Sequence, residues 1–148
     1  MASVLIIVVS AILLAYWFRC TCLIILSTRS AKDYASGVAV EKRLSFPGVE
    51  QRLATSAASD LRSLEMELHR DYQVVTQLLK QAGRLSVAGG SVEELMLQVD
   101  FWVLKACCGV STRFSEAKAR EALAEMCQVV GHLANTYGER AAAVPTSK

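Results

Sequence analysis

Two kinds of apolar pattern divide this chain: one unbroken run near its start, and periodic stretches after it. Residues 4–18 include no charged residue, no proline and no glycine. As a helix, residues 2–18 span about 26 Å at ~1.5 Å per residue, close to the roughly 30 Å of a bilayer core. We therefore predict a transmembrane anchor with its juxtamembrane segment over residues 1–26.

The membrane-spanning part is expected to end at Arg19. Tyr16, Trp17 and Phe18 come directly before it, and aromatic residues gather at membrane–water interfaces. An arginine is costly at mid-membrane, but near a helix end its guanidinium can extend to the headgroups. The residues assigned to the anchor are Val4, Leu5, Ile6, Ile7, Tyr16, Trp17, Phe18 and Arg19.

Other interpretations of the apolar run fit less well. A cleaved signal peptide has a basic start and a small-residue cleavage site, whereas this chain begins Met-Ala-Ser and the run ends in bulky aromatics. A mitochondrial presequence is amphipathic and arginine-rich, and a buried soluble helix has a polar face, neither of which is present. A retained single-pass anchor is the favoured interpretation, with the signal peptide as the main alternative.

The flanking charges predict on which side of the membrane the rest of the chain lies. Residues 19–43 carry five basic and two acidic side chains, and no basic side chain precedes the run. Cytoplasmic flanks hold such a basic excess, so we expect the C-terminal domain in the cytosol. The short apolar core favours the endoplasmic reticulum or another endomembrane over the plasma membrane.

Residues 27–46 show neither a sustained helical period nor alternation. We expect a basic linker here, attracted to anionic lipids. Residues 47–82, by contrast, predict one long amphipathic helix, because apolar positions recur at steps of three and four. A cap at Ser59 and Asp60 is the alternative, and it would start a separate helix.

Two further helices are expected after the long one. Ser91 and Glu94 have the spacing of a capping box, which predicts a helix over residues 92–108. Its broad apolar stripe predicts that this helix is the most buried. Another helix is expected over residues 116–137, and Gly138 is the expected stop.

The expected fold class is all-α. A single transmembrane helix and a linker precede a helical bundle over residues 47–140. We expect this bundle to contain three antiparallel helices, one of them long, because short glycine-containing connections favour antiparallel neighbours. A flexible tail is expected over residues 141–148.

Composition narrows the function classes. The net charge of +2 arises from residues 19–43, since residues 44–148 carry eleven basic and twelve acidic side chains. That balance argues against a nucleic-acid-binding face. The five cysteines are odd in number and suit free thiols in a reducing compartment.

Three residues are candidates for modification. Cys20 and Cys22 adjoin the predicted membrane boundary, where S-palmitoylation occurs, although small apolar residues at an interface need no such role. Ser45 follows Lys42 and Arg43, a pattern that basophilic kinases accept, and a phosphate there would weaken the attraction of the linker to lipid.

The sequence presents no pattern typical of catalysis, and we expect no enzyme, metal or cofactor. His69 and His132 lie on different predicted helices without a partner histidine at zinc-ligand spacing. No phosphate-binding glycine loop and no nucleophile elbow occurs.

The leading hypothesis is a membrane-anchored helical interaction protein, either an adaptor or a subunit of a membrane complex. Its partners would be the lipid bilayer and a protein partner or a second copy. An apolar stripe docks such partner helices, and the candidate surface is Leu61, Leu64, Leu68, Tyr72, Val75 and Trp102. The alternative is a lipid- or hydrophobic-ligand-binding helical domain at a membrane surface, with a pocket lined by Trp102, Met96, Met126 and Val130.

Overall fold

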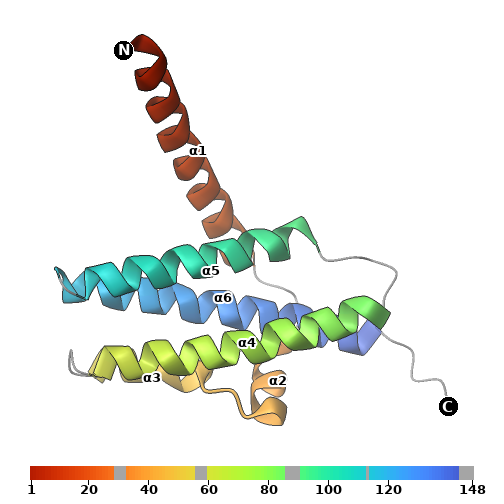
Figure 1. Ribbon diagram of the computed structural model, residues 1–148. Coiled ribbons are helices and arrows are strands. Elements are labelled where there is room, and N and C mark those ends of the chain that lie inside the picture. Colours follow the sequence, from red (N-terminus) through yellow and green to blue (C-terminus); the bar gives the residue numbers. More distant parts are fainter. Residues whose placement is uncertain (29–32, 56–59, 86–90, 113, 144–148) are drawn as a thin grey trace.

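The protein is all-helical in the described part of the chain (Figure 1), which confirms the expected fold class. The structure, a computed structural model, describes residues 1–28, 33–55, 60–85, 91–112 and 114–143. Its helices are α1 (Ala2–Ser27), α2 (Ala35–Lys42), α3 (Phe46–Thr55), α4 (Leu61–Leu85), α5 (Val92–Ser111) and α6 (Glu116–Ala143). One N-terminal helix is therefore followed by a helical domain.

The three long helices α4, α5 and α6 lie side by side, with α5 running opposite to the other two (Figure 1). Helix α6 is the centre of the domain and packs against α2, α3, α4 and α5. Its apolar residues recur on more than one face, so that Leu123, Met126 and Val130 have no solvent exposure. The antiparallel bundle is thus built around α6.

The expected single helix over residues 47–82 is wrong, because the chain forms α3 and α4 instead. Arg52 and Glu67 pair at 2.8 Å, whereas residues 15 positions apart in one continuous helix would lie about 22 Å apart. The chain therefore reverses between the two helices. This agrees with the alternative of a second helix start near Asp60, while Ser59 itself lies outside the described residues.

The expected linker is also wrong in its central part, because residues 35–42 form α2. Val38 and Ala39 of α2 are buried, and the N–H of Tyr34 donates to Asn135 Oδ1 at 2.7 Å. Arg43 ends the helix in the left-handed region (φ 54°). Burial against α6 stabilises this short helix, and a weak local period does not reveal such a contact.

Glycines of α6 are contact positions. The helix passes Gly138 and ends at Ala143, so Gly138 is not the stop that we expected. A Cβ on Gly138 would lie 2.4 Å from Tyr34 Cβ, which only glycine avoids. Of the expected tail, residues 141–143 are helical and 144–148 lie outside the described residues.

Candidate membrane-facing site

Helix α1 has a free part and a docked end. Its residues Ser3–Ser27 are long and apolar enough to cross a membrane, with a mean hydropathy of 2.1 in the most apolar stretch, none of which is buried. The anchor side chains that we assigned in its free part are each 61–70% exposed: Val4, Leu5, Ile6, Ile7, Tyr16 and Trp17. Phe18 and Arg19 are half-buried, where the helix meets α5 and α6 (Figure 1).

Arg19 joins α1 to the domain. Its Nη1 lies 2.9 Å from Asp100 Oδ1 on α5, and its Nη2 lies 2.6 Å from Glu125 Oε2 on α6. The planar guanidinium has donors for both carboxylates at once. Sequence reasoning assigned Arg19 to the headgroups alone, because nothing in its local pattern shows that two acids from distant helices lie within reach.

Asp100 depends on this contact. The carboxylate is fully buried, and its Oδ2 has no hydrogen-bond partner. Burial raises the pKa of Asp100, while the guanidinium of Arg19 acts in the opposite direction. A buried carboxylate without its partner is strongly unfavourable, so the foot of α1 and the interior of the domain stabilise each other.

The two candidate acylation sites differ in access. Cys22 is fully buried, with its Sγ 4.0 Å from the carbonyl oxygen of Met96, and Ile25 is buried one turn further on. Cys20 is partly exposed. Burial of the Cys22 thiol argues against acylation there, whereas the prediction for Cys20 stands as made.

Ser45 lies at an ordered junction rather than in a free linker. Asp71 Oδ2 accepts the N–H groups of Ser45 and Phe46 at 2.5 and 2.9 Å, and Arg70 donates to the Ser45 hydroxyl at 3.2 Å. Asp71 is buried, and burial raises its pKa against the effect of those N–H groups. A phosphate on Ser45 would meet Arg70 but would lie close to the Asp71 carboxylate.

The predicted partner surface is mostly the interior of the bundle. Its α4 members are buried in the core: Leu61, Leu64, Leu68, Tyr72 and Val75. The Tyr72 ring stacks on Phe101 of α5 with a centroid distance of 3.9 Å. Only Trp102, 54% exposed, lies on the surface. The prediction failed because an apolar stripe looks the same whether a neighbouring helix or a partner covers it.

Exposed apolar side chains gather instead on α5, which we expected to be the most buried helix. We call them the α5 outer face: Val92, Leu95, Val99, Trp102, Val103 and Val110. Along α5, which is described throughout, Glu93 is the one exposed residue with a charge. Lys105 is half-buried at the margin, and its Nζ lies 5.2 Å from the centroid of the Trp102 ring.

The residues proposed to line a hydrophobic-ligand pocket lie in different surroundings. Met126 and Val130 are buried in the core, while Trp102 is on the surface. A pocket of about 440 Å³ lies elsewhere, between α2, α3 and α6, and its lining includes Asp33 and Glu50. Among the described residues, no three His, Cys, Asp or Glu side chains are grouped to hold a metal ion.

Comparisons of this chain with protein-family models, with curated proteins and with solved structures find no match.

Proposed function

We propose that the protein is a single-pass membrane protein that holds its helical domain at a fixed position on the cytosolic side, as an adaptor or a subunit of a membrane complex. The observation that carries this proposal is the joint at Arg19. The anchor helix does not end in a free linker but continues into the domain, where Arg19 pairs with α5 and α6 and Cys22 is buried. This joint would fix the orientation of the domain relative to α1.

The orientation in this proposal follows from charge. The basic excess of residues 19–43 follows the apolar run, and such an excess is typical of the cytoplasmic side. The same charges favour contact with anionic lipids of the inner leaflet. An endomembrane such as the endoplasmic reticulum suits the short apolar stretch.

Two surfaces are available to a protein partner in this arrangement. One is the free part of α1, which can pack against other transmembrane helices. The other is the exposed side of α4, which carries mostly polar side chains such as Arg62, Gln73 and Lys80. Leu64 and Leu68 are excluded from either surface because the bundle itself covers them.

The first test is the topology of the full-length protein carrying a C-terminal tag. We expect it to resist alkaline extraction from membranes, and we expect protease to remove the tag from sealed cytosol-side-out vesicles. A tag that stays protected would contradict the cytosolic orientation. Release of the protein by alkali would contradict the anchor itself.

The second test compares complexes isolated in mild detergent. We expect a partner at stoichiometric amount with wild type, and its loss or marked reduction with Arg19→Gln. Arg52→Gln is the matched control, since it removes another arginine–glutamate ion pair that lies between α3 and α4. Equal recovery of the partner from both variants would show that the joint at Arg19 is not what the complex requires.

A further inference from the structure

The α5 outer face is one continuous strip. From Val92 to Val103 its members lie three or four positions apart or side by side, and Val110 follows two turns later, which places them on one side of a helix. From Val92 to Val110 the strip runs about 27 Å at ~1.5 Å per residue. Their exposed fractions range from 41% to 73%. An apolar strip of this length is open to whatever surrounds the domain on that side.

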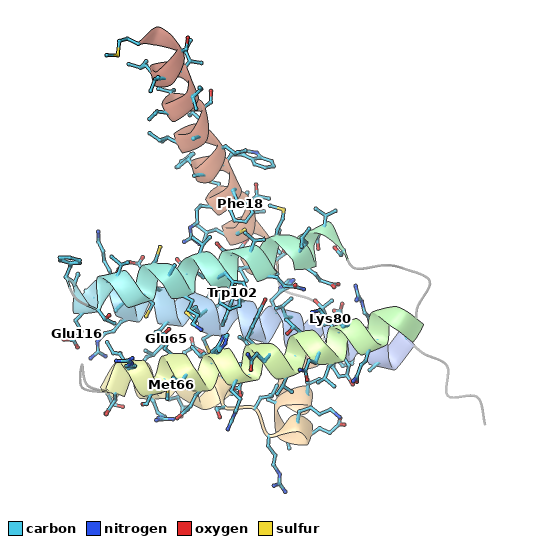
Figure 2. All side chains as sticks on the ribbon, viewed as in Figure 1. Phe18, Glu65, Met66, Lys80, Trp102 and Glu116 are labelled. Carbon is cyan, nitrogen blue, oxygen red and sulfur yellow. The ribbon has the colours of Figure 1, made fainter. Side chains whose placement is uncertain are left out.

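The strip lies at the level at which α1 would leave the membrane. Arg19 follows the exposed aromatic Trp17 and pairs with Asp100, which is near the middle of α5. In Figures 1 and 2, α5 is the bundle helix next to the free part of α1, with Phe18 beside it, and α4 is on the far side with Met66 and Lys80. A bilayer that holds α1 up to Phe18 therefore has its headgroups at α5.

The chemistry of the two sides agrees with this placement. The exposed side of α5 is apolar except for Glu93 at its start. Trp102 lies at the margin of this side toward α4, with its ring 5.5 Å from the His69 ring and 5.2 Å from Lys105 Nζ, and an aromatic ring beside a lysine favours a membrane–water interface. The exposed side of α4 is polar, and among its described side chains (residues 61–83) Met66 is the exposed large apolar one. One side of the domain thus suits lipid and the other suits water.

We propose that the α5 outer face is embedded in the headgroup region of the same bilayer that α1 crosses. The occupant is lipid and not a second copy, because α1 packs on α5, so that the bilayer that α1 crosses would lie next to this helix. The proposal rests on the insertion of α1. It adds a second contact with the membrane, in which α5 lies parallel to the surface and its apolar side chains enter to a depth of about 5–10 Å.

The chain allows a direct test, because it has two tryptophans, Trp17 in α1 and Trp102 on the α5 outer face. The full-length Trp17→Phe variant leaves Trp102 as the reporter. It is reconstituted in phosphatidylcholine–phosphatidylserine vesicles with bromine on the acyl chains just below the headgroups. We expect about two-fold quenching of the Trp102 emission by the brominated lipid, and protection from acrylamide in water, as for a ring at the interface.

The Trp102→Phe variant reports on the anchor through Trp17. If the lipid quenches Trp17 but not Trp102, the anchor inserts and the proposal for α5 is overturned. If it quenches neither, the proposed function and this proposal both fail. A third outcome also overturns the proposal: Trp102 is protected from acrylamide but is not quenched by the lipid, and the protection rises with the protein-to-lipid ratio. That outcome identifies a second copy as the occupant.

Charge substitutions provide the matched control. Val99→Glu and Val103→Glu, each in the Trp17→Phe background, add a carboxylate to exposed positions of α5, so the bundle is expected to fold as judged by its helical circular dichroism. Each should reduce the quenching of Trp102 by the brominated lipid. Met66→Glu on α4 adds the same charge on the far side and should leave the quenching unchanged. Equal quenching in all three variants would overturn the proposal.

Discussion

The ion pair between Asp100 and Arg19 links the end of α1 to the buried interior of the helical domain. The carboxylate is fully buried, while the guanidinium is one-third exposed and also reaches Glu125. Because burial raises the pKa of Asp100, its charged form is held in the folded protein by Arg19. The pair is therefore the residue-scale feature on which the position of α1 relative to the domain depends.

Arg19→Gln should destabilise the folded protein by about 2–3 kcal/mol at pH 7.5, below the ~3–5 kcal/mol of a fully buried pair because Arg19 is partly exposed. Without Arg19 the pKa of Asp100 rises further. The folded state then binds a proton more readily than the unfolded state, so stability falls as pH rises from about 4, the unfolded value, through the folded pKa.

The deficit relative to wild type should accordingly shrink at pH 5, as measured by denaturant unfolding of the full chain in detergent. The double variant with Asp100→Asn and Arg19→Gln should regain most of the lost stability, and the remaining deficit relative to wild type should no longer depend on pH. A deficit of the same size at both pH values would contradict the assigned role of Asp100.

Gly138 is the second residue whose role is decided by a contact. Gly138→Ala should cost about 1–3 kcal/mol, because the added Cβ would meet Tyr34 Cβ at 2.4 Å and force α2 away from α6. Gly83→Ala in α4 is the control: nothing lies within 4 Å of its Cβ position, and the helix should gain up to about 1 kcal/mol. Thermal unfolding of both variants would decide, and a stabilising Gly138→Ala would show that α2 does not pack there.

At the scale of elements, α4 and α5 differ from what their patterns predicted. The apolar stripe of α4, expected to be a partner surface, is buried, and α5, expected to be the most buried helix, exposes apolar side chains. The apolar stripe of α4 is covered by α6 and α3, and Tyr72 also stacks on Phe101 of α5. The apolar residues of α5 are divided between a buried side, with Leu97 and Leu104, and the α5 outer face. A stripe predicts an apolar surface, and only the packing shows which part of it the bundle covers.

Truncation of one side chain on each helix separates these roles. Leu64→Ala should cost about 2–5 kcal/mol, because it leaves a cavity in the core. Val99→Ala on the α5 outer face should change stability in detergent by less than about 0.5 kcal/mol, as for a surface substitution. Denaturant unfolding measures both. Similar costs for the two variants would mean that the α5 outer face is part of a protein interior.

At the scale of the whole molecule, α6 connects the rest. It contacts every other helix of the domain and also the end of α1, whereas α2 packs mainly on α6 through a few residues. Local opening of α2 breaks few contacts, but exposure of α6 requires the whole bundle to separate. Stability is therefore expected to differ along the chain.

Amide hydrogen exchange in detergent tests this order. The amides of residues 123–134 in α6 should exchange slowest, at a rate set by global unfolding, and those of α2 should exchange faster through local opening. The Gly138→Ala variant should speed exchange in α2 more than in α4. Exchange of α2 as slow as that of α6 would contradict a locally opening α2.

Much of the fold was predictable, and less of the site. Ser91 was identified as a cap from its spacing, and its Oγ accepts the N–H of Glu93 at 3.1 Å, although Glu94 pairs with Arg140 of α6 instead of returning to the cap. The joint at Arg19 and the α5 outer face were missed, because each depends on which helices lie side by side.

The sequence by itself determined the all-α class, the long apolar helix at the start and the beginnings of α5 and α6. These follow from periods and caps, which depend on residues within a few positions of one another. The tertiary structure alone decided that Arg19 meets Asp100, 81 positions away, and that Val99 stays outside while Leu64 is buried. The physical reason is that burial is set by contacts between distant segments, and an apolar stripe has the same local pattern whatever covers it.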